Sequence, residues 1–486
     1  MEALHLLFAT SEIFPLVKTG GLADVSGALP AALARLGVEV ALLLPGYAAA
    51  LDGAGPLQQI ARLDLPQHGE VRLLQGRMPD GLPLILIEHA GYYQRTGNPY
   101  LGPDGHDWPD NALRFGLLGQ MAAWLAGDHS PLPRRPDVLH CNDWQTALAP
   151  AYLHFYDRSP AATVMTIHNL AYQGVFPPAA LDALNLPQES FHLEGLEFHG
   201  MLSFLKAGLV YSGRITTVSP SYAHEIQHEP LGFGLQGLLH HRQDVLSGIL
   251  NGIDTEEWNP ARDPRLWAAY DADDLSGKAR NKTALQQAMG LAAEPDTPLL
   301  AVVSRIAPQK GLDVVADALP RLINLGFQFV LLGSGERTLE ARFRGLAETY
   351  RGRVAAHIGY DETLSHRIEA GADVFLMPSH FEPCGLNQMY SQRYGTLPVV
   401  APTGGLLDTV TDATPARLAD GSATGFVLER LDATHLAATL ERAAELYRRP
   451  DDWRRMQRAA MSRDFGWAAR AREYLELYRG ILAARA

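Results

Sequence analysis

The sequence predicts an α/β protein of two domains, each built on a parallel sheet with helices on both faces. Three features of its 486 residues predict this. Short apolar runs alternate with helix-like stretches near the N-terminus, and the alternation returns from residue 299. The runs are almost continuously apolar, as in strands that are buried on both faces. Polar residues follow many runs, where ligands of open α/β sheets bind.

The first 45 residues predict a strand, a helix and a second strand. LHLLFAT at 4–10 is apolar, LADVSGALPAALARLG at 22–37 has helical periodicity and ends at a glycine, and VEVALLLP fills 38–45. Further strands of the first half are predicted at residues 83–89, 137–143, 162–169 and 214–220.

The second alternation is more regular than the first. Strands are predicted at 299–304, 327–333, 353–360, 373–379 and 397–402, and helices at 311–326, 337–350 and 365–372. Between the two series, Gly252, Pro260 and Pro264 interrupt the periodicity, which predicts a domain boundary at 248–260. We therefore expect domains at 1–252 and 253–465 with a ligand cleft between them, followed by an amphipathic tail helix from Trp467.

Composition excludes several classes of protein. Hydrophobic residues make up 47% and charged residues 20%, which is typical of a globular chain. The formal charge of −13 disfavours nucleic acid and anionic membranes as partners. No apolar run reaches the roughly 18 residues of a membrane helix, and no signal peptide is visible. The two cysteines, Cys141 and Cys384, predict a reducing, cytoplasmic location.

Two loops carry cations beside glycines. Lys18-Thr19-Gly20-Gly21 lies between the first strand and the first helix, where backbone amides can approach an anion. It matches neither the dinucleotide fingerprint nor the P-loop, and a plain turn with a solvated lysine is the alternative. Arg305 and Lys310 lie in one loop after the strand at 299–304. They can neutralise a diphosphate without a metal, or they are two surface cations.

Carboxylates and histidines follow other predicted strands. Glu382 precedes a helix expected to begin near Gly385, so it can bind substrate hydroxyls or complement the helix dipole, and the amides of Cys384, Gly385 and Leu386 can receive phosphate. No base is apparent that would make Cys384 a nucleophile. His140, Asn142 and Asp143 end one strand, and His168 and Asn169 end another. Each histidine is either structural or part of a site.

No metal site is predicted. The chain has no H-E-x-x-H motif. Asp271-Ala272-Asp273 has the D-x-D spacing of a divalent-metal site, but it lies in an acidic run that a solvated turn explains.

In their order, several motifs resemble those of bacterial glycogen synthases, glycosyltransferases that elongate α-1,4-glucan from ADP-glucose. These motifs extend over essentially the whole chain and are KTGGLADV at 18, NDWQTAL at 142, TIHNLAYQG at 166, NGID at 251, SRIAPQKG at 304, IGYDETLSHRI at 358, FEPCGLNQMY at 381 and YGTLPVVAPTGGLLDTV at 394.

The resemblance implies a glycosyltransferase-B fold whose last helix, 466–486, returns to the N-terminal domain, and it implies a role for each matching residue. Arg305 and Lys310 hold the diphosphate, Tyr360 stacks on adenine and Glu382 binds glucose hydroxyls. Asp143 and His168 line the donor-sugar site. The remaining donor-binding residues are Lys18, Gly20, Gly21, Asp24, Asn251, Cys384, Gly385 and Leu386. The implied reaction retains the anomeric configuration, releases ADP and needs no cofactor or metal.

Two positions depart from the family pattern. Many relatives have His at the position of Asn142, and many have Thr at that of Asn387. Acceptor geometry or donor preference can therefore differ, with UDP-glucose as a variant donor. Two other functions are kept as alternatives. One is a nicotinamide-dependent oxidoreductase, against which Leu332-Gly333-Ser334-Gly335 lacks the third glycine. The other is a silent glucan-binding protein, which would need no diphosphate clamp.

Overall fold

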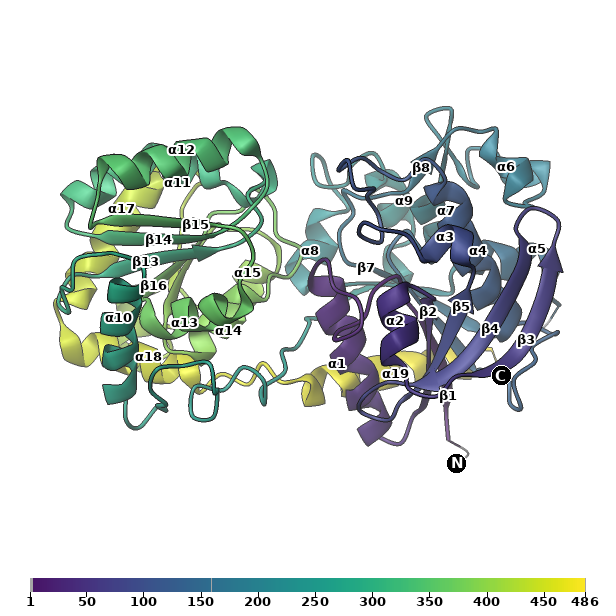
Figure 1. Ribbon diagram of the computed structural model, residues 1–486, viewed down its shortest axis with the longest axis horizontal. Helices are drawn as coiled ribbons and strands as arrows, with labels where there is room; N and C mark the ends of the chain where they lie inside the picture. The colour runs from purple at the N-terminus through teal and green to yellow at the C-terminus, as the bar shows by residue number, and fades with distance from the viewer. Residues whose placement is uncertain (1–2, 159, 486) are drawn as a thin grey trace. The chain divides into compact units, whose positions relative to one another are not determined.

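A computed structural model describes residues 3–158 and 160–485 of the chain. It divides into two compact units (Figure 1). Unit 1 runs to Gly252 and includes the C-terminal segment from Trp467, and unit 2 is Ile253–Gly466. Among the described residues, no helix has the length and apolar character needed to cross a bilayer.

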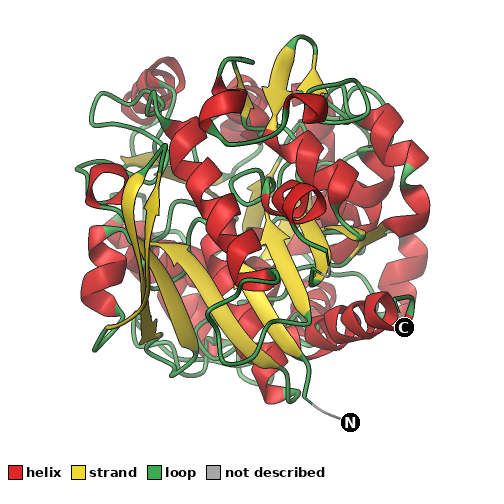
Figure 2. Ribbon diagram, turned by 90° about the vertical axis from the view of Figure 1, so that its right-hand side faces the viewer, coloured by secondary structure: helices red, strands yellow, loops and turns green. Residues whose placement is uncertain are grey.

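Unit 1 is built on a 9-stranded mixed sheet. In Figure 2 this unit faces the viewer. In sheet order the strands are β12 (Leu246–Gly248), β11 (Arg214–Thr217), β7 (Ala162–Ile167), β6 (Val138–Asn142), β1 (His5–Ala9), β2 (Glu39–Pro45), β5 (Pro83–Glu88), β4 (Gly69–Arg77) and β3 (Gln58–Leu65). The first seven are parallel, whereas β4 pairs antiparallel with both β5 and β3. A small antiparallel sheet adds β8 (Val175–Phe176), β10 (Met201–Ser203) and β9 (Glu197–Phe198).

The helices of unit 1 include one from the far end of the chain, α19 (Trp467–Ala483), which packs against α1 (Gly21–Arg35) (Figure 1). On its buried face, the Tyr478 hydroxyl lies 2.8 Å from Nδ1 of His140 on β6. Apolar residues at helical spacing and this hydrogen bond hold the tail on unit 1. The remaining helices are α2 (Ala48–Gly53), α3 (Ala90–Tyr93), α4 (Asn111–Ala126), α5 (Ala149–Tyr156), α6 (Ala180–Ala183), α7 (Phe204–Tyr211), α8 (Pro220–Glu225) and α9 (Gln236–His241).

Unit 2 has a 6-stranded sheet in which every pair is parallel. Its order is β15 (Val354–Ile358), β14 (Gln328–Gly333), β13 (Leu299–Val303), β16 (Val374–Met377), β17 (Leu397–Val400) and β18 (Phe426–Val427). This is the doubly wound order of dinucleotide-binding folds, in which the chain changes direction between β13 and β16. Its helices are α10 (Ser276–Ala288), α11 (Leu312–Asn324), α12 (Arg337–Thr349), α13 (Glu362–Gly371), α14 (Asn387–Arg393), α15 (Gly404–Thr409), α16 (Pro415–Asp420), α17 (Ala433–Tyr447) and α18 (Pro450–Met461).

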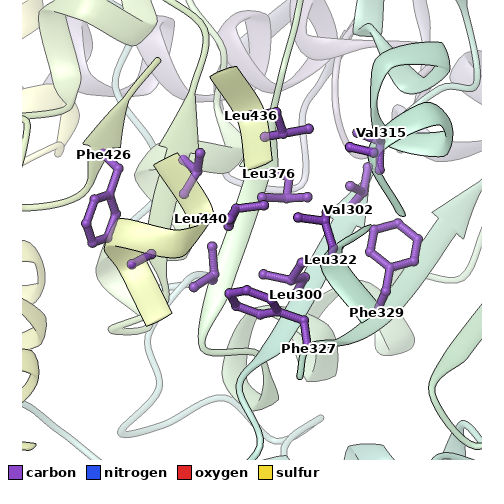
Figure 3. Packing of buried hydrophobic residues seen from close by; sticks show 14 of the residues in the cluster. Leu300, Val302, Val315, Leu322, Phe327, Phe329, Leu376, Phe426, Leu436 and Leu440 are labelled. Atoms are coloured by element: carbon purple, nitrogen blue, oxygen red, sulfur yellow. The ribbon is translucent and has the colours of Figure 1, made fainter. Parts of the chain in front are cut away.

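Both faces of this sheet are covered. Leu300 and Val302 of β13 point into a cluster with side chains of α11, β14 and α17 (Figure 3). Their neighbours Leu299 and Ala301 belong to a second cluster on the other face. Because alternate residues of a strand face opposite ways, a strand covered on both sides has an unbroken apolar sequence. Burial on both faces therefore explains the apolar runs from which these strands were predicted.

The predicted strands and the long helices are confirmed, and the structure adds what periodicity missed. The antiparallel β3 and β4 extend a sheet that was expected to be wholly parallel. They are half-exposed strands with polar residues on one face. The helix expected near Gly385 begins at Asn387, because Gly385 has a positive φ of 70° that no α-helix accepts.

Candidate functional site

The topological switch of unit 2 brings two predicted site loops together. Arg305 follows β13 and Glu382 follows β16, and these strands are neighbours in the sheet. In open α/β sheets the crevice outside the carboxyl ends of strands at such a switch is where ligands bind. Neighbouring strands explain why residues more than 70 positions apart in sequence meet here.

Lys310 and Glu382 form an ion pair across these two loops. Nζ of Lys310 lies 2.6 Å from Oε2 of Glu382, and the side chains are 18% and 7% exposed. The Ser379 hydroxyl donates to the same Oε2 at 2.9 Å. Within the described residues Oε1 of Glu382 accepts no hydrogen bond, so it remains available to a ligand. An ammonium has three N–H donors, and Lys310 therefore keeps donors beyond the one given to Glu382.

Two hydrogen bonds and a close backbone approach fix the Lys310 loop against the loop after β16. The Gln309 side chain donates to the carbonyl of Phe381 at 3.1 Å, and the amide of His380 donates to the carbonyl of Gln309 at 2.9 Å. Gly311 has a φ of 63°, and a Cβ there would lie 1.8 Å from the carbonyl oxygen of Pro378. Only glycine allows this close approach.

The Arg305 loop is fixed by the segment after β14. The amide of Ile306 donates to the carbonyl of Ser334 at 2.8 Å, and the amide of Glu336 donates to the carbonyl of Ile306 at 2.7 Å. A Cβ on Gly335 would lie 2.2 Å from the carbonyl oxygen of Ile306. Gly335 therefore lets the segment after β14 pack closely against the Arg305 loop. This packing gives the Gly333-Ser334-Gly335 segment a role other than cofactor binding. The Arg305 side chain is exposed and has no ion-pair partner among the described residues.

The segment 384–386 forms a turn ahead of α14. The Gln388 side chain donates to the carbonyls of Cys384 and Gly385 at 2.9 and 3.0 Å. Asn387 donates its side-chain amide to the carbonyl of Val303, at the end of β13, at 2.6 Å. Asn387 thus ties this turn to the strand that leads into the Arg305 loop. Sequence reasoning noted the residue only as a departure from the family pattern.

Tyr360 lies apart from this group. It follows β15 at the edge of the sheet, where its side chain is 75% exposed. Its hydroxyl donates to the carboxylate of Glu362, in the first turn of α13. The Asp361 side chain caps that helix by accepting the amide of Leu364 at 2.8 Å. An aromatic ring is therefore presented at the start of a capped helix.

Unit 1 has an equivalent switch between the neighbouring strands β1 and β6. The Lys18 loop follows β1, and Asn142 and Asp143 follow β6. Nζ of Lys18 lies 2.9 Å from Oδ1 of Asp24, and both side chains are part-exposed. Asn251 follows the edge strand β12, and its buried Oδ1 has no hydrogen-bond partner among the described residues.

Glu12 holds the Lys18 loop and was missed by sequence reasoning. Its buried carboxylate accepts the amide of Thr19 at 2.5 Å, the amide of Gly20 at 3.1 Å and the Tyr100 hydroxyl at 2.8 Å. The amide of Gly20, expected to approach a ligand anion, is therefore bound to a protein carboxylate. Polar residues directly after β1 were a signal for Glu12, whereas none pointed to Tyr100.

Asp143 and His168 lie together at the ends of β6 and β7. Oδ1 of Asp143 accepts the backbone amide of His168 at 2.7 Å, and Asp143 has a φ of 56°. Burial raises the pKa of Asp143 to about 7, although the amides of His168 and Asn169 oppose the shift. Burial lowers the pKa of His168 to about 3. At neutral pH the imidazole is therefore uncharged.

The raised pKa of Asp143 predicts a specific pH dependence of stability. Above a pH of about 4 an unfolded carboxyl loses its proton, whereas the folded Asp143 keeps it to about pH 7. Stability contributed at this site therefore falls as pH rises from about 4 to 7. Asp143→Asn removes the effect, keeps the acceptor oxygen and tolerates a positive φ.

In urea unfolding, Asp143→Asn is expected to gain stability relative to the wild type as pH rises from 4 to 7, and to hold that gain at pH 8. Comparing variant with wild type at each pH cancels the titration of other groups. A difference that is the same at every pH would contradict the assignment.

Two family models match the chain. A model of the starch synthase catalytic domain matches residues 5–241, and a model of glycosyl transferases group 1 matches residues 287–460. The glycogen synthase of Nitrosospira multiformis is 53% identical over 484 residues, which cover 99% of this chain and 97% of that protein. The glycogen synthase of Thioalkalivibrio sulfidiphilus is also 53% identical, with 99% of this chain and 100% of that protein covered.

One solved structure belongs to the same family, and a more distant one shares the fold. The catalytic domain of starch synthase IV from Arabidopsis thaliana, bound to ADP and acarbose, matches with a TM-score of 0.89 and 34% identity. The match covers 99% of this chain and 100% of that one. Sucrose-phosphate synthase from Thermosynechococcus elongatus is 18% identical with a TM-score of 0.58, which shows a shared fold.

Proposed function

The chain belongs to the glycogen and starch synthase family of glycosyltransferases and has their glycosyltransferase-B fold, and from this we propose that it transfers glucose from ADP-glucose to the non-reducing end of an α-1,4-glucan. The solved relative binds ADP, which supports an adenine nucleotide as the leaving group. The nucleotide carries a diphosphate, so the site must supply concentrated positive charge within a chain of formal charge −13.

The observation that carries the proposal is the placement of Arg305 and Lys310 at the switch point of unit 2. Arg305 is exposed and has no ion-pair partner among the described residues, so its guanidinium can bind two phosphate oxygens. Lys310 is held by Glu382, whose Oε2 also accepts the Ser379 hydroxyl, and the ammonium keeps donors beyond the one given to Glu382. Preorganised cations of this kind stabilise the charge that develops on a departing diphosphate.

Glu382 has a second role in the proposal. Its Oε2 is occupied by Lys310 and Ser379, which fixes the carboxylate plane. The remaining Oε1 is an acceptor for glucose hydroxyls. Glu382 therefore orients the sugar and does not attack it. The amides of Cys384, Gly385 and Leu386 complete the donor site on the same edge of the sheet.

The reaction we propose retains the anomeric configuration. The bond between the anomeric carbon and the diphosphate oxygen breaks, and the acceptor hydroxyl forms its bond on the same face of the sugar. The proton of that hydroxyl passes to the leaving phosphate. Asp143 fixes the backbone of His168, whose carbonyl stabilises the oxocarbenium-like sugar.

Other residues serve the donor without taking part in the chemistry. The exposed Tyr360 ring is suited to stack on adenine. Lys18, Asp24 and Gly21 are further donor-binding residues of the proposal, together with Gly20, where a Cβ would meet no atom within 4 Å. The buried Oδ1 of Asn251 can accept a hydrogen bond from the donor sugar.

We propose no metal or cofactor, because Arg305 and Lys310 supply the charge that a divalent cation would otherwise provide. Turnover should accordingly persist in a chelator. We also propose the cytoplasm as the compartment, because two cysteines in a chain of 486 residues are too few for a disulfide framework.

A donor assay tests the function. The purified chain is incubated with glycogen and either ADP-glucose or UDP-glucose, and nucleotide release and glucan length are measured. Release of ADP with lengthening of the glucan and a higher kcat/KM for ADP-glucose is expected. Proton NMR of the product should show new α-linkages. The proposal fails if no glucose nucleotide supports transfer.

Cys384→Ser is expected to keep most of the activity. The side chain is 4% exposed, and the role proposed for this residue belongs to its backbone amide. Serine is similar in size and adds a hydroxyl that the turn must accommodate. Complete loss of activity in a variant with wild-type unfolding behaviour would indicate a role for the thiol.

A further inference from the structure

Asn142 connects three elements at the switch point of unit 1. It is the last residue of β6, and its side chain is buried. Nδ2 donates to the carbonyl of Ala9, at the end of β1, at 3.0 Å. Oδ1 lies 3.0 Å from Nε2 of His168, which directly follows β7. One amide thus bridges the ends of three parallel strands.

These contacts determine which nitrogen of His168 carries its proton. The carbonyl of Ala9 can only accept a hydrogen bond, so the NH₂ of Asn142 must face it. Oδ1 then faces His168, and it too can only accept. Nε2 of His168 must therefore carry the hydrogen, and in the neutral imidazole Nδ1 carries the lone pair. Within the described residues Nδ1 has no hydrogen-bond partner.

The surroundings of His168 favour this neutral form. Burial lowers the pKa of His168 to about 3. Asp143 bonds the backbone amide of His168, and Glu12 interacts with Asp143. His140 also lies close, but its nitrogens are engaged by Tyr478 at 2.8 Å and by Thr166 at 2.6 Å. Asn142 is thus the partner of the His168 ring.

We propose that Asn142 is a positioning residue that holds His168 as the Nε2–H tautomer, so that Nδ1 is presented as an acceptor to a hydroxyl of the donor sugar. The inference rests on the proposed function, because it takes His168 to line the donor-sugar site. In the Nδ1–H tautomer, His168 would present an N–H to the sugar hydroxyl in place of an acceptor. Other active sites also require a histidine to be held in one tautomer.

The proposal also explains the departure at this position. A neutral imidazole, like a carboxamide, offers one donor atom and one acceptor atom that are separated by a single carbon. A histidine at position 142 can therefore donate to the carbonyl of Ala9 and accept from Nε2 of His168. Asn and His are equivalent for this purpose, whereas an isosteric apolar residue is not.

The test compares Asn142→Leu with Asn142→His in protein labelled with ¹⁵N at histidine. The ¹⁵N shifts of His168 should show the Nε2–H tautomer in the wild type and in Asn142→His, and a mixture or the Nδ1–H form in Asn142→Leu. Asn142→Leu should lower kcat about tenfold or more, as loss of a residue that orients a functional histidine commonly does. Asn142→His should restore the rate.

Asn111→Leu is the matched control for the spectrum and for stability. Asn111 is a buried amide of the same unit, bonded to the carbonyl of Tyr100 and to Arg114, with no contact to His168. It should lose stability but leave the His168 tautomer unchanged. An Nε2–H tautomer in Asn142→Leu, or Asn142→His no better than Asn142→Leu, would overturn the proposal. Absence of transfer by the wild type would overturn the proposed function and leave the tautomer result standing.

Discussion

Lys310→Ala is expected to lower kcat by about a hundredfold or more, and to destabilise unit 2 at the same time. Loss of one preorganised charge-stabilising donor costs about 3 to 4 kcal/mol in the transition state. The loss of stability has a separate cause. Glu382 is 7% exposed and would keep a buried carboxylate without its cation, and breaking such a pair typically costs about 3 to 5 kcal/mol. Single-turnover kinetics at saturating donor and urea unfolding measure the two effects.

A second buried ion pair of unit 2 provides the control. Nζ of Lys282 lies 2.7 Å from Oδ2 of Asp373, and the side chains are 6% and 10% exposed. Lys282→Ala should therefore destabilise unit 2 about as much as Lys310→Ala, while the folded protein keeps its kcat. If both variants lost the same fraction of kcat, the effect of Lys310 would be structural and the diphosphate clamp would be wrong.

Arg305→Ala should separate catalysis from stability. Its side chain is exposed and forms no ion pair with any described residue, so its removal leaves no buried charge behind. We expect a fall in kcat of about a hundredfold, with little change in the urea midpoint. Wild-type turnover in this variant would remove the arginine from the clamp.

The sequence predicted the parts of the molecule that follow local rules. Strands such as 299–304 were readable because a strand buried on both faces is apolar throughout. The sequence also identified candidate site residues, because Arg305, Lys310 and Glu382 follow such strands. The sequence did not predict that these residues lie at one switch point, because the order of strands in a sheet depends on which distant strands pair.

The hydrogen-bond partners of the candidate residues could not be predicted from local sequence patterns either. Glu12 binds two backbone amides of the Lys18 loop and a hydroxyl 88 positions away, and no periodicity encodes such a contact. Asn142 and Asn387 were noticed only as departures from a family pattern. The structure shows each of them donating its amide to the last residue of a strand, Ala9 and Val303. In both cases the side-chain amide makes a contact across the sheet.

Gly311 should be the most sensitive backbone position of the clamp. It is the residue after Lys310, its φ is 63°, and a Cβ there would lie 1.8 Å from the carbonyl oxygen of Pro378. In Gly311→Ala the Lys310 loop must move away from the loop after β16. We expect a loss of about 3 kcal/mol or more in the free energy of unfolding, since strain and a backbone clash add.

Gly290→Ala separates the clash from the backbone strain. Gly290 has a similar φ of 69°, and a Cβ there would meet no atom within 4 Å. Alanine at this position should cost only the roughly 1 to 2 kcal/mol of a left-handed residue and leave kcat unchanged. Because movement of the Lys310 loop breaks the 2.6 Å contact with Glu382, folded Gly311→Ala should lose kcat as Lys310→Ala does. Equal urea midpoints for the two glycine variants would show that the loop relaxes without cost, and the packing assigned to Gly311 would then be wrong.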